Sequence, residues 1–168
     1  MGTRNLTVVK NKAGQTKIAQ YGQWDGYPSY SGIQALEFLR NKDWQALLHA
    51  KLDLVQFVDD EEVDTLYKQY ESTDWENKEF LNAYPGLHRD TGIGILAVVA
   101  NAIAPIKTVD NTEFAKDDLF CEGVYEVDFS TNKFITVYAD NKVSYDLDDL
   151  PSDEEYLAMW VRADDLVR

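Results

Sequence analysis

The chain has 168 residues, of which 45% are hydrophobic, and it carries a formal net charge of −14 at pH 7. This length and composition predict one globular domain over residues 1–168 and exclude an intrinsically disordered chain. No apolar run reaches the roughly 20 residues that a membrane-spanning helix needs, and the N-terminus has no signal-peptide pattern. A single cysteine excludes an internal disulfide bond. We therefore expect a cytoplasmic protein.

The charge is unevenly distributed along the chain. Residues 1–42 hold six basic and two acidic residues, whereas the remainder holds ten basic and 28 acidic residues. A negative field of this size repels nucleic acid and anionic membranes and attracts basic proteins. We therefore expect a basic protein partner, with no direct binding to nucleic acid or membrane. Solubility alone is the alternative explanation of the charge.

The chain begins with a predicted β-hairpin. Residues 6–10 and 17–21 are rich in β-branched or alternating apolar residues, and a Gly-containing turn separates them. The loop that follows, residues 21–32, holds four aromatic rings, three glycines and one carboxylate. Neither a core nor a plain surface loop requires that mixture. We therefore expect a site on or beside this loop.

Several helices are predicted after the loop. Ser31 and Gln34 fit a capping box that starts the first helix, which ends near Asn41, and Asp43 is the predicted cap of the second. The second helix should bury Trp44 and Leu47. The strongest helical pattern follows residues 59–62, with apolar residues at Val63, Leu66, Tyr67 and Tyr70. A shorter helix is predicted for residues 75–82.

The second half of the chain combines one apolar helix with further strands. Residues 91–102 are apolar on nearly all sides out to Ile103, which predicts a central, buried helix. Residues 120–129 and 134–138 form a predicted hairpin, with a further strand at 142–146. Ser152 is the predicted cap of a last helix that packs Tyr156, Met159 and Trp160 inward.

This order of elements predicts an α+β fold. The N-terminal β-hairpin and the C-terminal antiparallel strands should form one sheet, packed on several helices that include the central apolar helix.

Four motifs together resemble a known family. They are MGTRNLT running on to AQYGQWDGYP, RDTG before the apolar helix, DLFCE before a strand, and YDLDDLP near the end. The resemblance is to a family of small proteins found in phages and prophages, mostly without assigned function. Gly123 departs from the family pattern, which has Trp there, and this departure removes an aromatic wall from the expected site.

The resemblance implies a setting more than a chemistry. Small acidic phage proteins include many that disable host defences, among them anti-CRISPR proteins that block Cas9. Such inhibitors often present carboxylates to a basic nucleic-acid channel. The C-terminal third offers a candidate partner surface of this kind, with a solvated face as the alternative. Its residues are Asp146, Asp148, Asp149, Asp153, Glu154 and Glu155.

A ligand site is the second hypothesis, and it joins the aromatic loop to the RDTG motif. Rings of the loop would stack on a base, carboxylates would accept from its edge, and an Arg before a helix N-terminus would bind an anion. The alternative is that the Arg pairs with a carboxylate and the rings only close the core. The residues concerned are Tyr21, Gln23, Trp24, Asp25, Tyr27, Arg89, Asp90 and Glu122.

A zinc site is a third hypothesis. The set of residues with soft ligands is Cys121, His88, Asp90 and His49, and their spacing matches no zinc-finger pattern. A buried, inert thiol is the simpler interpretation of Cys121.

Enzymatic motifs are not found. The chain has no P-loop, no GxSxG and no Ser-His-Asp order, and Gly2 cannot act as an N-terminal nucleophile. We therefore expect a protein that acts by binding and not by catalysis. The preferred partner is a Cas9-type host nuclease, and the alternative is a pocket that binds or sequesters a nucleotide-type signal.

Overall fold

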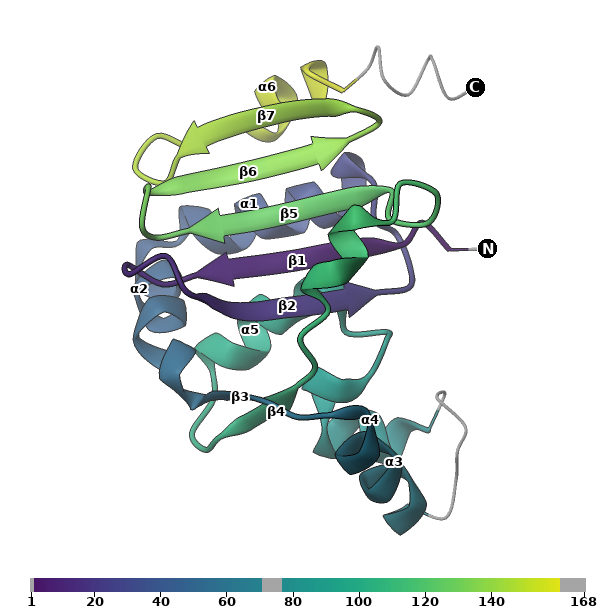
Figure 1. The fold of residues 1–168 in the computed structure, drawn as a ribbon. Coiled ribbons are helices and arrows are strands. Elements are labelled where there is room, and N and C mark those ends of the chain that lie inside the picture. The colour runs from purple at the N-terminus through teal and green to yellow at the C-terminus, as the bar shows by residue number, and fades with distance from the viewer. Residues whose placement is uncertain (1, 71–76, 161–168) are drawn as a thin grey trace.

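A five-stranded sheet forms the centre of the protein (Figure 1). The computed structural model describes residues 2–70 and 77–160. The strand order β2-β1-β5-β6-β7 places the N-terminal hairpin beside the C-terminal strands. This confirms the α+β class and the prediction that these two sets of strands share one sheet. The strands are β1 (Asn5–Lys10), β2 (Thr16–Gly22), β5 (Gly123–Asp128), β6 (Lys133–Tyr138) and β7 (Asn141–Asp146).

The sheet is mixed, because one of its strand pairings is parallel. Strands β1 and β5 are parallel, with Leu6 opposite Val124, whereas β1–β2, β5–β6 and β6–β7 are antiparallel. A parallel neighbour requires a long crossover connection. The helices between the two hairpins provide this connection. No local sequence pattern therefore sets the parallel direction of β1 and β5.

Most of the helices cover one face of the sheet (Figure 1). They bury Leu36, Leu48, Val99 and other apolar residues against Val127 and Phe134 of the strands. On the opposite face, Phe114 of a 3-10 turn covers a smaller cluster on β1 and β2. These helices are α1 (Ile33–Arg40), α2 (Lys42–Lys51), α5 (Ile95–Ala100) and α6 (Asp153–Ala158), and the 3-10 turn on the other face is η5 (Thr112–Lys116).

A second, smaller unit lies beyond the edge strand β2. The sequence did not predict its two short parallel strands, β3 (Val55–Phe57) and β4 (Ile106–Thr108). Helices α3 (Asp60–Gln69) and α4 (Lys78–Ala83) pack together beside them, with Tyr67 stacked on Phe80 at 3.9 Å between ring centroids. The predicted helix over residues 75–82 begins in a stretch, 71–76, that lies outside the described residues. No helix among the described residues is long and apolar enough to cross a membrane.

The helix caps differ from the sequence expectation at two points. Ser31 caps no helix. It lies in a π-helical turn, η1 (Pro28–Gly32), and its Oγ donates to the carbonyl of Asp25 at 2.7 Å. Helix α2 is capped by Asn41 instead of Asp43, because the Asn41 side chain accepts from the backbone N–H groups of Asp43 and Trp44. The predicted cap Ser152 is confirmed at α6.

Several side chains predicted to be buried are exposed. Trp44 and Leu47 are 49% and 40% exposed, Met159 is 54% exposed and Ile103 is 97% exposed. The central helix is also shorter than expected. It begins at Ile95 after a 3-10 turn, η4 (Gly92–Gly94). The φ of +46° at Gly92 lies outside α-helical geometry and excludes a helix that starts at residue 91. Apolar periodicity alone therefore predicted more buried side chains, and a longer central helix, than the structure has.

Candidate functional site

The aromatic loop is held in place by the side chain of Asn5, the first residue of β1. Asn5 is fully buried, and its Nδ2 lies 3.1 to 3.3 Å from three backbone oxygens: Thr3 O, Gly22 O and Trp24 O. The backbone N–H of Gly26 also donates to Thr3 O at 2.9 Å. The loop is therefore tied back to the strand from which the sheet begins.

The RDTG segment runs directly beside this loop. The backbone N–H of Gln23 donates to the carbonyl of Arg89 at 3.0 Å. A Cβ at Gly22 would lie 2.9 Å from the Cα of Gly92 and 2.6 Å from Asn5 Oδ1. Real Cβ atoms do not approach so closely, so Gly22 is needed for the two backbones to pass at this distance.

Three of the predicted site residues form one connected group. Trp24 Nε1 donates to Asp90 Oδ1 at 2.8 Å, and the guanidinium carbon of Arg89 lies 5.4 Å from the centre of the Trp24 ring. Arg89 Nε lies 3.8 Å from Asp90 Oδ1. The Arg89 charge therefore rests on the indole face while the indole N–H is satisfied by the neighbouring carboxylate. Trp24 remains 45% exposed.

The other predicted loop residues pair with one another. Tyr21 donates its hydroxyl to Gln23 Oε1 at 2.5 Å, and Tyr27 donates to Asp25 Oδ1 at 2.8 Å. The bond to Asp25 raises the pKa of the Tyr27 hydroxyl, because ionised Tyr27 would lose that bond and face a carboxylate. Tyr21 also packs edge-on against Phe114. Of the three rings predicted to stack on a ligand, only Trp24 is available in the groove described next.

A groove of about 350 Å³ lies between the loop and the RDTG segment. We call it the loop groove. Its walls bring together Gln23, Trp24 and Asp25 from the loop with Arg89 and Asp90. Asp25 adopts a φ of +53°, in the left-handed region that few residues other than Gly, Asn and Asp visit. The groove is completed by Gly22, Tyr30, Ser31, Gln34, Thr91, Gly92, Ile93 and Gly94.

Tyr30 is a groove residue that the sequence hypothesis missed. It is 46% exposed and lines the loop groove from the η1 turn. Its position inside the aromatic loop was the available signal, but the hypothesis stopped at Tyr27.

The expected position of Arg89 before a helix N-terminus is wrong. Arg89 does not directly precede an α-helix, because α5 begins only at Ile95.

Glu122 is not part of the groove. It is exposed, and its backbone N–H donates to Arg4 O at 3.0 Å just before β5 begins. The next residue, Gly123, is needed for another reason. A Cβ there would clash with the carbonyl of Gly26, which also accepts the Tyr125 hydroxyl at 2.5 Å. The site therefore has no space for the Trp that the family resemblance would place at Gly123.

The four candidate zinc ligands do not gather into one site. Within the described residues, no group of three or more His, Cys, Asp and Glu side chains could hold a metal ion. His88 is buried and its Nδ1 accepts from the backbone N–H of Asp90, while His49 packs against the ring of Phe129. Cys121 lies before β5 and packs against the small cluster around Leu6. It is thus half-buried, on the face of the sheet opposite Tyr125.

The acidic C-terminal surface is partly neutralised within the chain. Three of its six carboxylates form ion pairs: Asp146 with Lys133 at 2.6 Å, Asp148 with Lys42 at 3.1 Å, and Asp153 with Arg40 at 2.7 Å. Hydrogen bonding from Lys42 also lowers the pKa of Asp148. The carboxylate of Glu155 accepts from Ser152 Oγ at 3.1 Å. Asp149 and Glu154 make no ion pair within the described part of the chain.

Comparisons with known proteins returned no match: no family model, no curated protein and no solved structure matches this chain.

Replacing Asn5 by Ala should lower the free energy of unfolding by about 2–4 kcal/mol, because the buried carbonyl of Gly22 and the part-buried carbonyls of Thr3 and Trp24 lose their donor. Urea denaturation measures the change. Asn101→Ala is the matched control, since Asn101 donates to one exposed carbonyl, and it should cost less than about 1 kcal/mol. Equal losses for the two variants would show that Asn5 does not hold the loop.

The Cys121 thiol should react slowly with Ellman's reagent. Burial, with Asp117 and Glu122 nearby, raises its pKa to about 11, so roughly 0.1% is thiolate at pH 8, against about a quarter for an unperturbed thiol. The absorbance of the released thiolate measures the rate. The control is the same chain in denaturing urea, which should react at the rate of a free thiol. A native rate equal to the denatured rate would contradict the structure.

Proposed function

We propose that the protein acts by binding a small aromatic ligand of nucleotide type in the loop groove. The observation that carries this proposal is the pairing of two half-exposed rings, Trp24 and Tyr30, with Arg89 in one groove of about 350 Å³. A volume of this order suits a small ligand. Large rings left open to water beside a cationic side chain are a suitable surface for stacking a base.

Each group in the loop groove has a role that its chemistry supports. The ring of Trp24 or Tyr30 provides a stacking surface, and Arg89 offers N–H donors to an anionic group. Gln23 and Asp25 offer acceptors to the edge of a base. The hydrogen bond from Trp24 to Asp90 holds the indole in one orientation before the ligand arrives, which reduces the entropy lost on binding.

A second candidate is an acidic counter-defence protein that inhibits a host nuclease of the Cas9 type in the host cytoplasm. The specific observation in its favour is the net charge of −14, which attracts a basic partner. The resemblance to phage proteins supports the same setting. Ion pairing of Asp146, Asp148 and Asp153 weakens the C-terminal surface as a mimic of nucleic acid. For this reason we rank the inhibitor second.

Replacing Trp24 by Ala tests the first candidate. The wild-type melting temperature should rise with a ligand from a panel of mono-, di- and cyclic nucleotides. The variant should bind that ligand roughly 5- to 150-fold more weakly, as expected for about 1–3 kcal/mol of lost stacking. Trp44→Ala is the control, since Trp44 is 49% exposed outside the groove. If no nucleotide shifts the wild-type melting temperature, or if both variants weaken binding equally, the loop groove is not a nucleotide site.

Reversing Asp149 and Glu154 to Lys tests the second candidate. These residues make no ion pair within the described residues, so the change should leave the folded structure unperturbed. Wild-type protein should inhibit DNA cleavage by a Cas9-type nuclease at low salt and less at high salt, and the variant should inhibit at least tenfold less. The control reverses Glu61 and Asp64 on α3. Absence of inhibition by wild-type protein at low salt would rule this candidate out for the nuclease used.

A further inference from the structure

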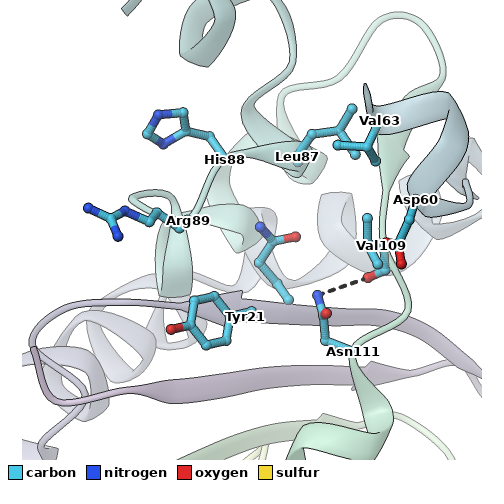
Figure 2. Close-up of a pocket in the computed structure, with 10 residues that line it drawn as sticks. Tyr21, Asp60, Val63, Leu87, His88, Arg89, Val109 and Asn111 are labelled. Carbon is cyan, nitrogen blue, oxygen red and sulfur yellow. Dashed lines mark hydrogen bonds between the residues drawn. The ribbon is translucent and has the colours of Figure 1, made fainter. Parts of the chain in front are cut away.

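A second cavity lies on the other side of the Arg89 segment, between β2 and helix α3 (Figure 2). We call it the α3 cavity. Its volume is about 200 Å³, and none of its lining residues except Arg89 lines the loop groove. It is lined by Gln20, Tyr21, Asp60, Val63, Gly86, Leu87, His88, Arg89, Val109 and Asn111.

The α3 cavity has an apolar side and an acidic rim. Figure 2 shows Val63 and Val109 beside Asp60, with Leu87 close to Val63. Asp60 is exposed and makes no ion pair within the described part of the chain. Its neighbour Glu62, by contrast, is paired with Lys107 at 2.5 Å. An apolar surface next to an unpaired carboxylate suits a ligand with an alkyl stem and a cationic head.

A buried acceptor adds a second, independent observation. Gln20 is only 3% exposed and lines the α3 cavity, yet its Oε1 has no hydrogen-bond partner among the described residues. An unsatisfied buried acceptor is costly. The last side-chain torsion of a Gln is soft, so the Gln20 amide can turn to meet a ligand in the cavity. A ligand N–H then supplies the donor that the oxygen lacks.

Neither His88 nor the Arg89 guanidinium opposes this ligand. Figure 2 shows the side chains of His88 and Arg89 extending to the side away from Asp60. The guanidinium of Arg89 lies over Trp24 instead, at the loop groove. The two sides of the Arg89 segment therefore differ in polarity: the loop groove holds the cation, and the α3 cavity holds acceptors.

We propose that the α3 cavity binds a small organic cation, an ammonium or guanidinium head on a short alkyl stem. The head lies at the Asp60 carboxylate and within reach of Gln20, and the stem packs on Val63 and Val109. The net charge of −14 raises the local concentration of such cations. The same chemistry is offered by a free amine and by an Arg or Lys side chain of a basic protein.

The test uses butylguanidinium as probe and its neutral isostere butylurea as comparison. Titration calorimetry of the full chain should show butylguanidinium binding at one site and no binding of butylurea at the same concentration. Asp60→Asn should weaken binding at least tenfold. Glu61→Gln is the matched control, because Glu61 lies in the same exposed first turn of α3 and does not line the cavity, and it should change binding less than twofold.

Two further variants locate the probe. Gln20→Leu should also weaken binding, whereas Trp24→Ala should not, because Trp24 lines only the loop groove. Loss of binding in Trp24→Ala would place the cation over the indole ring and overturn the proposal. Equal binding of butylurea, or equal losses in the Asp60 and Glu61 variants, would overturn it as well.

A final comparison separates the two sources of the cation. Agmatine represents a free amine, and an acetylated Gly-Arg-Gly amide represents a side chain of a protein. Tighter binding of agmatine supports a free ligand, and tighter binding of the peptide supports a basic partner. If neither binds while butylguanidinium does, the cavity admits only the bare head and stem, which still supports the site.

Discussion

The buried amide of Asn5 is the interaction on which the site depends. Its Nδ2 has two protons and lies within hydrogen-bond distance of three carbonyl oxygens, so it joins the start of β1 to the end of β2 and to the aromatic loop. Its oxygen leaves no space for a side chain at Gly22, and this allows the Gly92 backbone to pass closely. The position of Arg89 and Asp90 beside Trp24 follows from that approach. A single buried side chain thus connects the sheet to both walls of the loop groove.

The segment that carries Arg89 divides two cavities of different chemistry. On the loop side, the guanidinium is held over an indole ring and faces a groove with a second exposed ring, Tyr30. On the α3 side, the same segment lines a cavity with a buried amide, Gln20, and a carboxylate, Asp60, that makes no ion pair among the described residues. Consecutive residues at the end of β2 line the two cavities, and Arg89 lines both.

The acidic character of the chain is not equivalent to an acidic binding surface. Lys133, Lys42 and Arg40 each pair with one carboxylate of the C-terminal cluster, and two of these pairs join β6 to β7 or α1 to the start of α6. Exposed pairs of this kind contribute little to stability. They do reduce the local negative potential that a basic partner would meet. The charge therefore favours association with cations in general more than it defines one partner surface.

The sequence by itself determined the elements whose signals are local. Turn residues and the alternation of apolar residues predict the two hairpins and the β7 strand, and one side-chain hydrogen bond defines the Ser152 cap. All these signals lie within a few residues of the chain. The sequence also led to the hypothesis that joins the loop to the RDTG motif, because aromatic rings, carboxylates and an Arg together suit one ligand site. Only the tertiary structure decided the parallel pairing of β1 with β5, the exclusion of Glu122 from the groove and the entry of Tyr30. The pairing and the exclusion of Glu122 depend on close approach between segments far apart in the chain, as at Gly123 beside the Gly26 carbonyl, where space and not local preference sets the outcome. Tyr30 is near Trp24 in the chain, but it lines the groove together with the RDTG segment, which is far away in the chain.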